Sequence, residues 1–280
     1  MEAKRHNYEY DIDTASDSAP ANVVRMVGKG KRVLEIGCGP GSITKVLATS
    51  GRCSVTGLEL DNEAIKKVEP FCEAIFKADL NSEEWPSLLD DLERFDVVVA
   101  ADVLEHLYDP WNTLKRMVPF IKEDGYIVIS LPHAGHAAII SCLIDGDFQY
   151  GDWGLLDRTH IRFFCLRNIE ELFFKAGLKI VDISYVTKMP QDTEFSSQWS
   201  RLSSEAKKVL AQSPHSNIYQ VVIKAVPEER VGVALSLAPN RVLKPKSDFL
   251  SLLRRYLSAR LGSDSKIMIR RVLRGVGIKL

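Results

Sequence analysis

Three glycines in the segment VLEIGCGPGS form the most chemically suggestive pattern in the chain. Gly37, Gly39 and Gly41 follow an apolar run typical of a buried strand and precede a helical pattern. Glycines at such a junction permit a tight turn and a close approach of the backbone to a ligand, and the following helix offers unpaired N–H groups. The spacing is not the G-x-G-x-x-G of dinucleotide-binding loops, and the G-K-[ST] of a phosphate-binding loop is absent. The loop therefore predicts a cofactor site of another kind.

A second segment, GLLDRTHIRFFC, places Asp157, Arg158, His160 and Arg162 in a run otherwise suited to a sheet or a core. In an extended conformation the side chains would alternate between two faces, with His160, Arg162 and Phe164 on one and Thr159, Ile161 and Phe163 on the other. Such a strip could cover a reaction centre. It could also be an edge strand whose histidine and arginine lie in water, and the periodicity alone favours this second interpretation.

The histidines are the residues best suited to proton transfer, because the pKa of imidazole lies near neutral pH. His133 follows Pro132 at the carboxyl end of an expected strand, and His136 lies three residues further on. This H-x-x-H spacing could hold a metal ion, but the sequence supplies no third ligand, so no metal site is predicted.

Apolar runs alternating with helical patterns must position these residues. Strands are expected at 32–36, 54–60, 74–78, 95–101 and 126–131, with helices at 42–48, 62–68, 83–92 and 111–121. Near-continuous apolar strands separated by helices indicate a parallel sheet covered on both faces, an α/β doubly wound fold.

The later part of the chain predicts one more helix and a final pair of strands. Asn168 as N-cap, Glu171 as its capping-box partner and Gly177 as the C-terminal stop delimit the helix. Strands are expected at 179–186 and 217–226, separated by a polar excursion that contains the helix-like SSEAKKVLAQ.

Several motifs in order resemble class I S-adenosylmethionine (SAM)-dependent methyltransferases over residues 30–226. VLEIGCGPGS resembles the acidic-x-G-x-G-x-G loop of that family, TGLELD and ADL resemble the ends of its second and third strands, and FDVVVAADVLEHLYDP and GYIVISLPH its fourth and fifth. The resemblance implies a seven-stranded, Rossmann-like sheet and SAM as the cofactor.

The resemblance also assigns cofactor-binding residues. Glu59 would accept hydrogen bonds from the ribose hydroxyls, Asp79 would accept one from the adenine amino group, and Asp102 ends the fourth strand beside the cofactor. The implied cofactor set is Glu35, Gly37, Gly39, Gly41, Glu59, Leu60, Asp79, Leu80, Asp102 and Val103.

The segment LLDRTHIRFFCLRNIEELFFKAGL looks like one that recurs in bacterial SAM methyltransferases of glycan pathways, and the N-terminal YEYDID is similar to that group too. It departs from the group at Cys165, where threonine is more usual. The resemblance implies a lid between His133 and Asp157. His160 and His133 are then the candidate general bases and Asp157 an orienting partner, with His106, Trp153 and Arg162 as acceptor contacts.

Composition excludes several other classes. The 280 residues carry no net charge, and neither a signal pattern nor a bilayer-length apolar run is present, so we expect a cytoplasmic protein. Five scattered cysteines indicate neither disulfides nor zinc. Residues 241–280 contain eleven lysines and arginines against two acidic residues.

We therefore expect a methyltransferase domain over residues 1–226, followed by a linker and a basic amphipathic extension over 227–280. Such an extension suits the inner face of an anionic membrane, and packing on the acidic body or on a second subunit explains it as well. No nucleic-acid motif is present, and the oligomeric state is not predicted.

The expected function is O-methylation of a sugar or glycan precursor, or of a related small acceptor. A phenol or quinone-precursor O-methyltransferase is the first alternative, because the glycine-loop-to-LEH layout also resembles ubiquinone-biosynthesis enzymes. A non-catalytic SAM-binding partner protein is the second.

Overall fold

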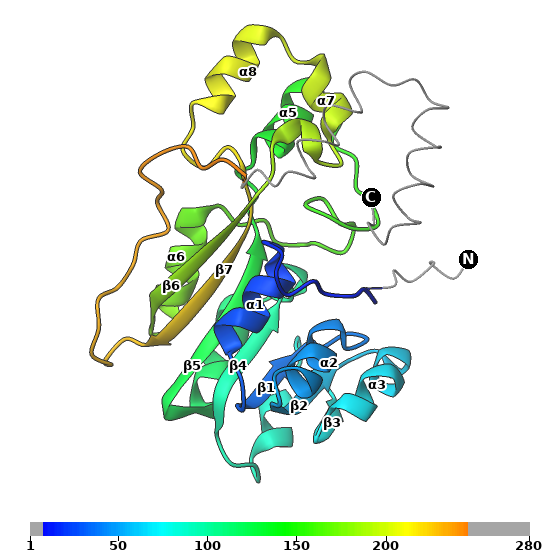
Figure 1. Ribbon diagram of the computed structural model, residues 1–280, viewed down its shortest axis with the longest axis vertical. Helices are drawn as coiled ribbons and strands as arrows, with labels where there is room; N and C mark the ends of the chain where they lie inside the picture. The colour runs from blue at the N-terminus through cyan, green and yellow to red at the C-terminus, as the bar shows by residue number, and fades with distance from the viewer. Residues whose placement is uncertain (1–7, 246–280) are drawn as a thin grey trace. The chain divides into compact units, whose positions relative to one another are not determined.

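The computed structural model describes residues 8–245, which contain seven strands and the helices that cover them (Figure 1). The strands are β1 (Arg32–Ile36), β2 (Ser54–Glu59), β3 (Ala74–Lys77), β4 (Phe95–Ala101), β5 (Ile121–Pro132), β6 (Leu178–Thr187) and β7 (Ile218–Pro227). The α-helices are α1 (Ala19–Val27), α2 (Ser42–Thr49), α3 (Asn62–Val68), α4 (Pro110–Met117), α5 (Ala137–Asp145), α6 (Leu166–Lys175), α7 (Ser196–Arg201) and α8 (Ser204–Ala211). Short 3₁₀ helices occupy Glu69–Phe71 (η1), Trp85–Leu89 (η2), Leu104–His106 (η3), Val118–Phe120 (η4) and Pro190–Asp192 (η5).

The seven strands form one sheet in the order β3-β2-β1-β4-β5-β7-β6. The first five strands are parallel to one another, and β7 runs antiparallel to both of its neighbours. The doubly wound, Rossmann-like, seven-stranded sheet expected from the sequence is thus confirmed.

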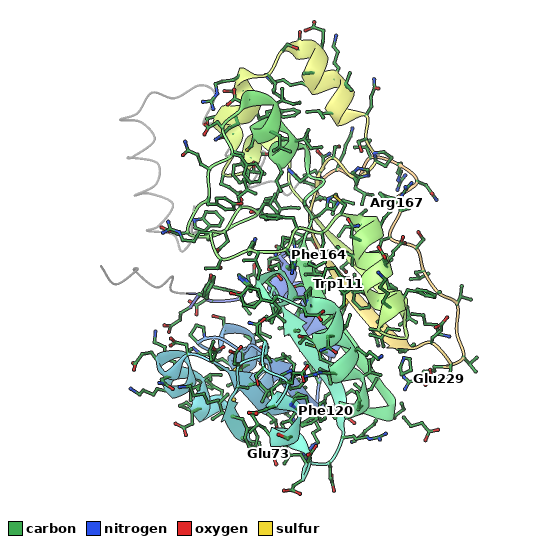
Figure 2. All side chains as sticks on the ribbon, turned by 180° about the vertical axis from the view of Figure 1, so that it is seen from behind. Glu73, Trp111, Phe120, Phe164, Arg167 and Glu229 are labelled. Atoms are coloured by element: carbon green, nitrogen blue, oxygen red, sulfur yellow. The ribbon has the colours of Figure 1, made fainter. Side chains whose placement is uncertain are left out.

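Alternation along the strands divides the core between the two faces of the sheet. In β1 and β4, Val33 and Val97 pack with α1 and α2 on one face, while Leu34 and Val98 pack with α4 and α6 on the other. Successive side chains of a strand point to opposite faces, so continuous apolar runs bury both. Figure 1 shows α1 and α2 in front of the sheet, and Figure 2, seen from the opposite side, shows α4 and α6, the helices of Trp111 and Arg167, on the other face.

The parallel strands all deliver their carboxyl ends to the same edge. The glycine loop follows β1 there, and η3 follows β4. The excursion between β6 and β7 contains α7 and α8, and α7 contacts α5, the helix that follows β5. Leu155, Leu156, Phe195 and Tyr219 form a small separate core with α5.

Several element bounds differ from the expected ones for identifiable reasons. The helix expected at 83–92 is only the 3₁₀ turn η2, which contains Pro86. The helix expected at 111–121 ends at Met117 and continues as η4, because Pro119 has no N–H for an α-helical bond. Residues 121–132 form one strand whose register shifts between the pairs Phe95–Ile121 and Val97–Tyr126.

Helix α6 begins earlier than predicted. Its N-cap is Cys165, and Asn168 occupies the third helical position, where its Oδ1 accepts a hydrogen bond from the Cys165 N–H (3.2 Å). The capping box is therefore present, but its members are Cys165 and Asn168, so the predicted Asn168–Glu171 pair is wrong. Gly177 follows the helix with φ +71°, as a C-terminal stop requires.

Residues after β7 pack on the domain instead of leaving it at 227. Leu237 is fully buried, and its carbonyl accepts a hydrogen bond from the Tyr185 hydroxyl (2.9 Å). The compact unit therefore continues to Lys244. Most of the predicted basic extension lies outside the described residues. Within residues 8–245, no helix has both the length and the apolar character needed to cross a bilayer.

Candidate functional site

The glycine loop provides an open cradle between β1 and α2. Gly37, Gly39 and Gly41 all have positive φ (67°, 54° and 92°), which favours glycine. A Cβ on Gly37 would lie 2.8 Å from a methyl carbon of Val103, so that position is closed by packing. A Cβ on Gly39 would meet no atom of the described chain within 4 Å, so this backbone faces free space that a ligand can enter.

Carboxylates and an apolar side chain surround this open face. The Glu59 carboxylate accepts hydrogen bonds from the N–H groups of Gly39 (2.7 Å) and Leu60 (2.8 Å). The Leu60 side chain is 53% exposed, and Asp79 is exposed in the turn after β3. Polar acceptors flanking an apolar side chain suit a nucleoside, so the residues present fit the ribose and adenine of SAM. Leu80, beside Asp79, packs partly against the core.

Glu35 is a structural member of the loop. Its carboxylate is buried and accepts a hydrogen bond from the Thr44 hydroxyl (2.7 Å) on α2. Burial raises the pKa of Glu35 to about 7, although the Thr44 hydrogen bond lowers it in part. The contact ties β1 to the helix whose N-terminus borders the cradle.

Asp102 adopts a positive φ of 54°, which is uncommon for a residue other than glycine. Its carboxylate accepts hydrogen bonds from Ser130 (2.8 Å) on β5 and from Gln220 (3.0 Å) on β7. Burial raises the pKa of Asp102. Three strands thus fix this carboxylate at the sheet edge, and neither Ser130 nor Gln220 was foreseen from the sequence.

The segment 159–162 lies directly on the η3 turn. The Glu105 carbonyl accepts hydrogen bonds from the N–H groups of both Ile161 and Arg162 (3.0 Å each). His106 Nδ1 lies 3.2 Å from the Thr159 carbonyl and 3.0 Å from its hydroxyl.

The segment 159–162 is not a strand. Its burial nevertheless alternates: His160 is 9% exposed, whereas Ile161 and Phe163 are 40% and 41% exposed. This is the reverse of a wet edge strand, in which the histidine would face water.

A chain of hydrogen bonds orients His106. The carbonyl of Thr159 can only accept, so Nδ1 of His106 carries the proton and Nε2 is left with its lone pair. The Thr159 hydroxyl donates to Asp157 (2.7 Å), which also accepts from the Tyr8 hydroxyl (3.2 Å). Burial alone would raise the pKa of Asp157, but hydrogen bonds from Thr159 bring it below its ordinary value. Burial lowers the pKa of His106, so its ring is neutral at pH 7.

His160 is held in the same tautomer. Its Nδ1 donates to the Leu155 carbonyl (3.2 Å), and its Nε2 lies 3.9 Å from the Glu105 carboxylate. Burial, with a contribution from His106, lowers the pKa of His160 to about 4. The rings of His106 and His160 meet edge to face at 4.8 Å. Asp157, predicted to orient His160, reaches His106 through Thr159 instead.

His133 and His136 are buried apart from this pair. Nδ1 of His133 bonds to the Ile218 carbonyl (3.1 Å), and Nε2 of His136 bonds to the Lys188 carbonyl (3.0 Å). His136 also caps α5 by accepting the Ala138 N–H (3.1 Å). Burial lowers the pKa of each to about 4. Both rings support the chain around them, and a catalytic role for His133 stays a prediction.

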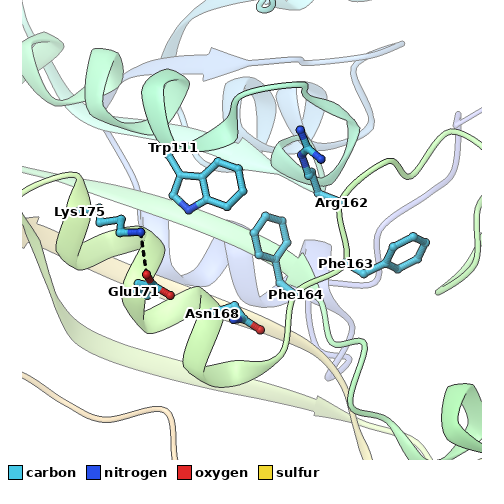
Figure 3. A pocket seen from close by; sticks show the side chains of 7 residues that line it. All are labelled: Trp111, Arg162, Phe163, Phe164, Asn168, Glu171 and Lys175. Atoms are coloured by element: carbon cyan, nitrogen blue, oxygen red, sulfur yellow. Dashed lines mark ion pairs between the residues drawn. The ribbon is translucent and has the colours of Figure 1, made fainter.

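Arg162 and Trp153 lie in different parts of the structure. The Arg162 guanidinium donates to the Tyr108 carbonyl (2.5 Å) and lies 5.8 Å from the Trp111 ring centre. It lines a pocket of ≈220 Å³ between α4 and α6, which Figure 3 shows with Trp111 and Phe164 facing one another. Trp153 is 56% exposed on the segment before the strip. Acceptor contact by either residue stays a prediction.

Two features of the site carried little signal in the sequence. The N-terminal segment crosses the start of α2, where the Tyr10 N–H donates to Ser42 Oγ (3.0 Å) and Ser42 donates to the Tyr8 carbonyl (3.2 Å). Glu105 is fully buried, and neither carboxylate oxygen has a hydrogen-bond partner among residues 8–245. A charged residue between Leu104 and Leu107, both buried, was the available clue.

Comparison with known proteins places this site in context. A family model described as "Methyltransferase domain" matches residues 7–183. A "Ubiquinone biosynthesis O-methyltransferase" from Coxiella burnetii is 24% identical over 168 residues, covering 60% of this chain and 71% of that protein. A protein of the same description from Nitrosospira multiformis is 28% identical over 178 residues, covering 59% and 73%. The fold resembles a SAM-dependent methyltransferase from Archaeoglobus fulgidus with a TM-score of 0.51 and 20% identity, covering 74% of this chain and 91% of that one.

Proposed function

The chain belongs to the methyltransferase domain family and is a SAM-dependent enzyme, and from this premise we propose that it methylates a hydroxyl oxygen on a sugar or glycan precursor, or on a related small acceptor. The proposal concerns the acceptor, because family membership already fixes the reaction type and the cofactor. One observation carries it: the neutral, oriented imidazole of His106 lies in the η3 turn, which comes after β4 and directly follows Val103, and Val103 packs against Gly37 of the glycine loop.

The cofactor half of the chain would bind SAM. Glycine N–H groups, Glu59, Leu60 and Asp79 would hold the nucleoside of SAM at the open face of the loop. When bound, SAM supplies a methyl group that is already activated by its sulfonium. The protein therefore needs mainly to align the acceptor oxygen and to remove its proton.

We propose His106, which was predicted as an acceptor contact, as the residue that removes that proton, in place of the predicted bases His160 and His133. Its Nδ1 is engaged by Thr159, and its Nε2 lone pair is left to accept a proton from an acceptor hydroxyl. The lowered pKa keeps the ring unprotonated at pH 7, and Asp157, acting through Thr159, stabilises the charge that appears on protonation. His160 is more deeply buried and packs against the His106 ring.

The acceptor side also exposes aromatic and apolar side chains. Tyr150 is 53% exposed, and Phe148 contacts both Tyr150 and Phe163, with ring centres 5.7 and 6.4 Å apart. Phe163 in turn lies 6.5 Å from the His160 ring. A sugar ring can stack on such a surface through its C–H face.

The same surface favours a second candidate acceptor, a phenol or quinone precursor, because a planar ring stacks on Tyr150 and Phe163 equally well. The names of the curated relatives support this alternative. Radiolabelled SAM incubated with a sugar nucleotide and, separately, with a polyphenol would distinguish the two. Label in the sugar supports the proposal, label only in the polyphenol selects the alternative, and label in neither contradicts both.

A further inference from the structure

Glu105, His106 and His160 each bring one potential metal-ligating atom to the same place, and these atoms lie within 4.8 Å of one another. Two residues come from η3 and the third from the segment that crosses it. Glu105 is fully buried with both carboxylate oxygens unpartnered among the described residues, and Oε1 faces His160 Nε2 at 3.9 Å. A carboxylate left in this state is unfavourable unless something else pairs with it.

We propose that Glu105, His106 and His160 bind a divalent transition cation, such as Mn²⁺ or Zn²⁺, on the acceptor side of the site. The donor set of one carboxylate oxygen and two imidazole nitrogens suits such ions better than Mg²⁺ or Ca²⁺, which prefer oxygen alone. Ligand atoms around a bound ion are separated by roughly 3–3.5 Å. The observed separations, up to 4.8 Å, are wider, so cation binding requires the three side chains to move closer together.

The surroundings of the two histidines match those of metal ligands. A ligating imidazole usually donates its other N–H to a carbonyl or carboxylate, which fixes the tautomer. Nδ1 of His160 bonds to the Leu155 carbonyl, and Nδ1 of His106 bonds to Thr159, which is itself held by Asp157. Both Nε2 lone pairs are thereby left for the cation.

Three protein ligands leave coordination positions open, and His106 is half-buried, so the site is accessible from the acceptor side. Two adjacent oxygens of one acceptor fill such positions best, as a vicinal diol or a catechol provides. A coordinated hydroxyl has a lower pKa, so its proton leaves to bulk water. The oxygen keeps the electron pair that bonds to the methyl carbon as the donor's carbon–sulfur bond breaks. With the cation bound, His106 Nε2 is a ligand, and coordination of the hydroxyl takes over the proton removal that the proposed function gives to His106 in the ion-free protein. This acceptor role rests on the proposed function, whereas cation binding does not.

Equilibrium dialysis of the chelator-treated full chain against Mn²⁺ or Zn²⁺ alone, followed by elemental analysis, tests the site. We expect about one tightly held ion per chain. Glu105→Gln, which keeps the shape of the side chain, and His160→Ala should each weaken binding by at least about 100-fold. His215→Ala removes a histidine outside the cluster and should bind as the wild type does. If His160→Ala does not fold, the cation binding of Glu105→Gln alone decides whether the site exists.

Absence of binding, or binding that Glu105→Gln leaves unchanged, would overturn the proposal.

The acceptor role is tested by measuring methyl transfer in the ion-loaded protein. A catechol is compared with a monophenol, and a cis-diol glycoside with its monodeoxy analogue. Preference for the two-oxygen member of a pair supports chelation, and equal rates in both pairs overturn it. Stoichiometric, Glu105-dependent binding without methylation of any hydroxyl supports the cation site and contradicts only the proposed function.

Discussion

The two halves of the site are built differently. On the cofactor side, the polar groups already have protein partners: Glu59 is held by loop N–H groups and Glu35 by Thr44. On the acceptor side, Glu105 is buried without a hydrogen-bond partner in the described chain, and two neutral histidines face it with free lone pairs. The first half is preorganised without its ligand, whereas the second is completed only by what binds there.

This difference separates the residues that set the affinity for SAM from those that determine the rate of methyl transfer. Glycines and strand-end carboxylates determine how tightly the cofactor is held, while the residues on η3 and on 157–160 determine whether an acceptor oxygen reacts. Changes in the cofactor half should therefore alter SAM affinity, whereas changes in the acceptor half should alter kcat or stability.

The largest effect is expected from His106→Ala on the acceptor side. Loss of its Nε2, which accepts the proton of the acceptor or binds the proposed cation, should lower kcat by roughly 10²–10⁴-fold, while the SAM dissociation constant stays within about twofold. Steady-state kinetics and calorimetric titration with SAM measure the two quantities. His215→Ala is the control, and an equal fall in kcat there would remove the specific role of His106.

Gly39→Ala should act on the cofactor side. The new methyl group enters the open face of the loop and should weaken SAM binding by about 10- to 100-fold, or roughly 1.4–2.8 kcal/mol. Gly30 is a matched control, because it also has positive φ (64°) and open space around its Cα but lies at the opposite end of β1. If Gly30→Ala weakened SAM binding equally, backbone strain and not the cradle would be responsible.

Glu105→Gln should stabilise the ion-free protein. Burial holds the pKa of Glu105 well above its ordinary 4.5. As pH rises past 4.5 the unfolded chain loses this proton before the folded chain does, so the free energy of unfolding falls. The variant escapes this loss and should be more stable at pH 7 by about 1–3 kcal/mol, with the advantage vanishing near pH 4.

Urea unfolding at both pH values measures this difference. Glu63→Gln changes an exposed glutamate on α3 and should leave stability within about 0.5 kcal/mol. A Glu105→Gln protein less stable than the wild type at pH 7 would show that the carboxylate is paired favourably.

Cys165→Thr should have the smallest effect. Cys165 is the N-cap of α6 and follows directly on the segment 159–164. A threonine hydroxyl is a better acceptor for the helix N–H groups than a thiol, so we expect a gain of about 0.5–1 kcal/mol in unfolding free energy with unchanged kcat. Thermal unfolding and kinetics check both, and a changed kcat would mean that the cap also positions the acceptor side.

The cofactor half could be predicted because its signals are local. Glu35, Glu59, Asp79 and Asp102 each lie at or just after the carboxyl end of a strand, and parallel strands bring those ends to one edge. Their approximate positions therefore follow from the strand pattern alone. The hydrogen bonds of Asp102 to Ser130 and Gln220 could not be predicted from the strand pattern, because they depend on the register of β5 and β7.

The acceptor half could be predicted only in part. The segment around His160 was recognisable, but its partner was not, since His106 and Thr159 are 53 positions apart and no periodicity links them. The start of α6 was misplaced because asparagine at the third helical position and asparagine as N-cap give similar patterns. Leu166 and Ile169, both buried, show where the helix begins to face the core.

The SAM concentration dependence of single-turnover methyl transfer, compared between Gly39→Ala and His106→Ala, tests the separation of the two halves most directly. Saturating SAM should restore Gly39→Ala to near the wild-type rate and leave His106→Ala slow by at least about 100-fold. Rescue of His106→Ala by SAM, or a Gly39→Ala protein that stays slow at saturation, would contradict it.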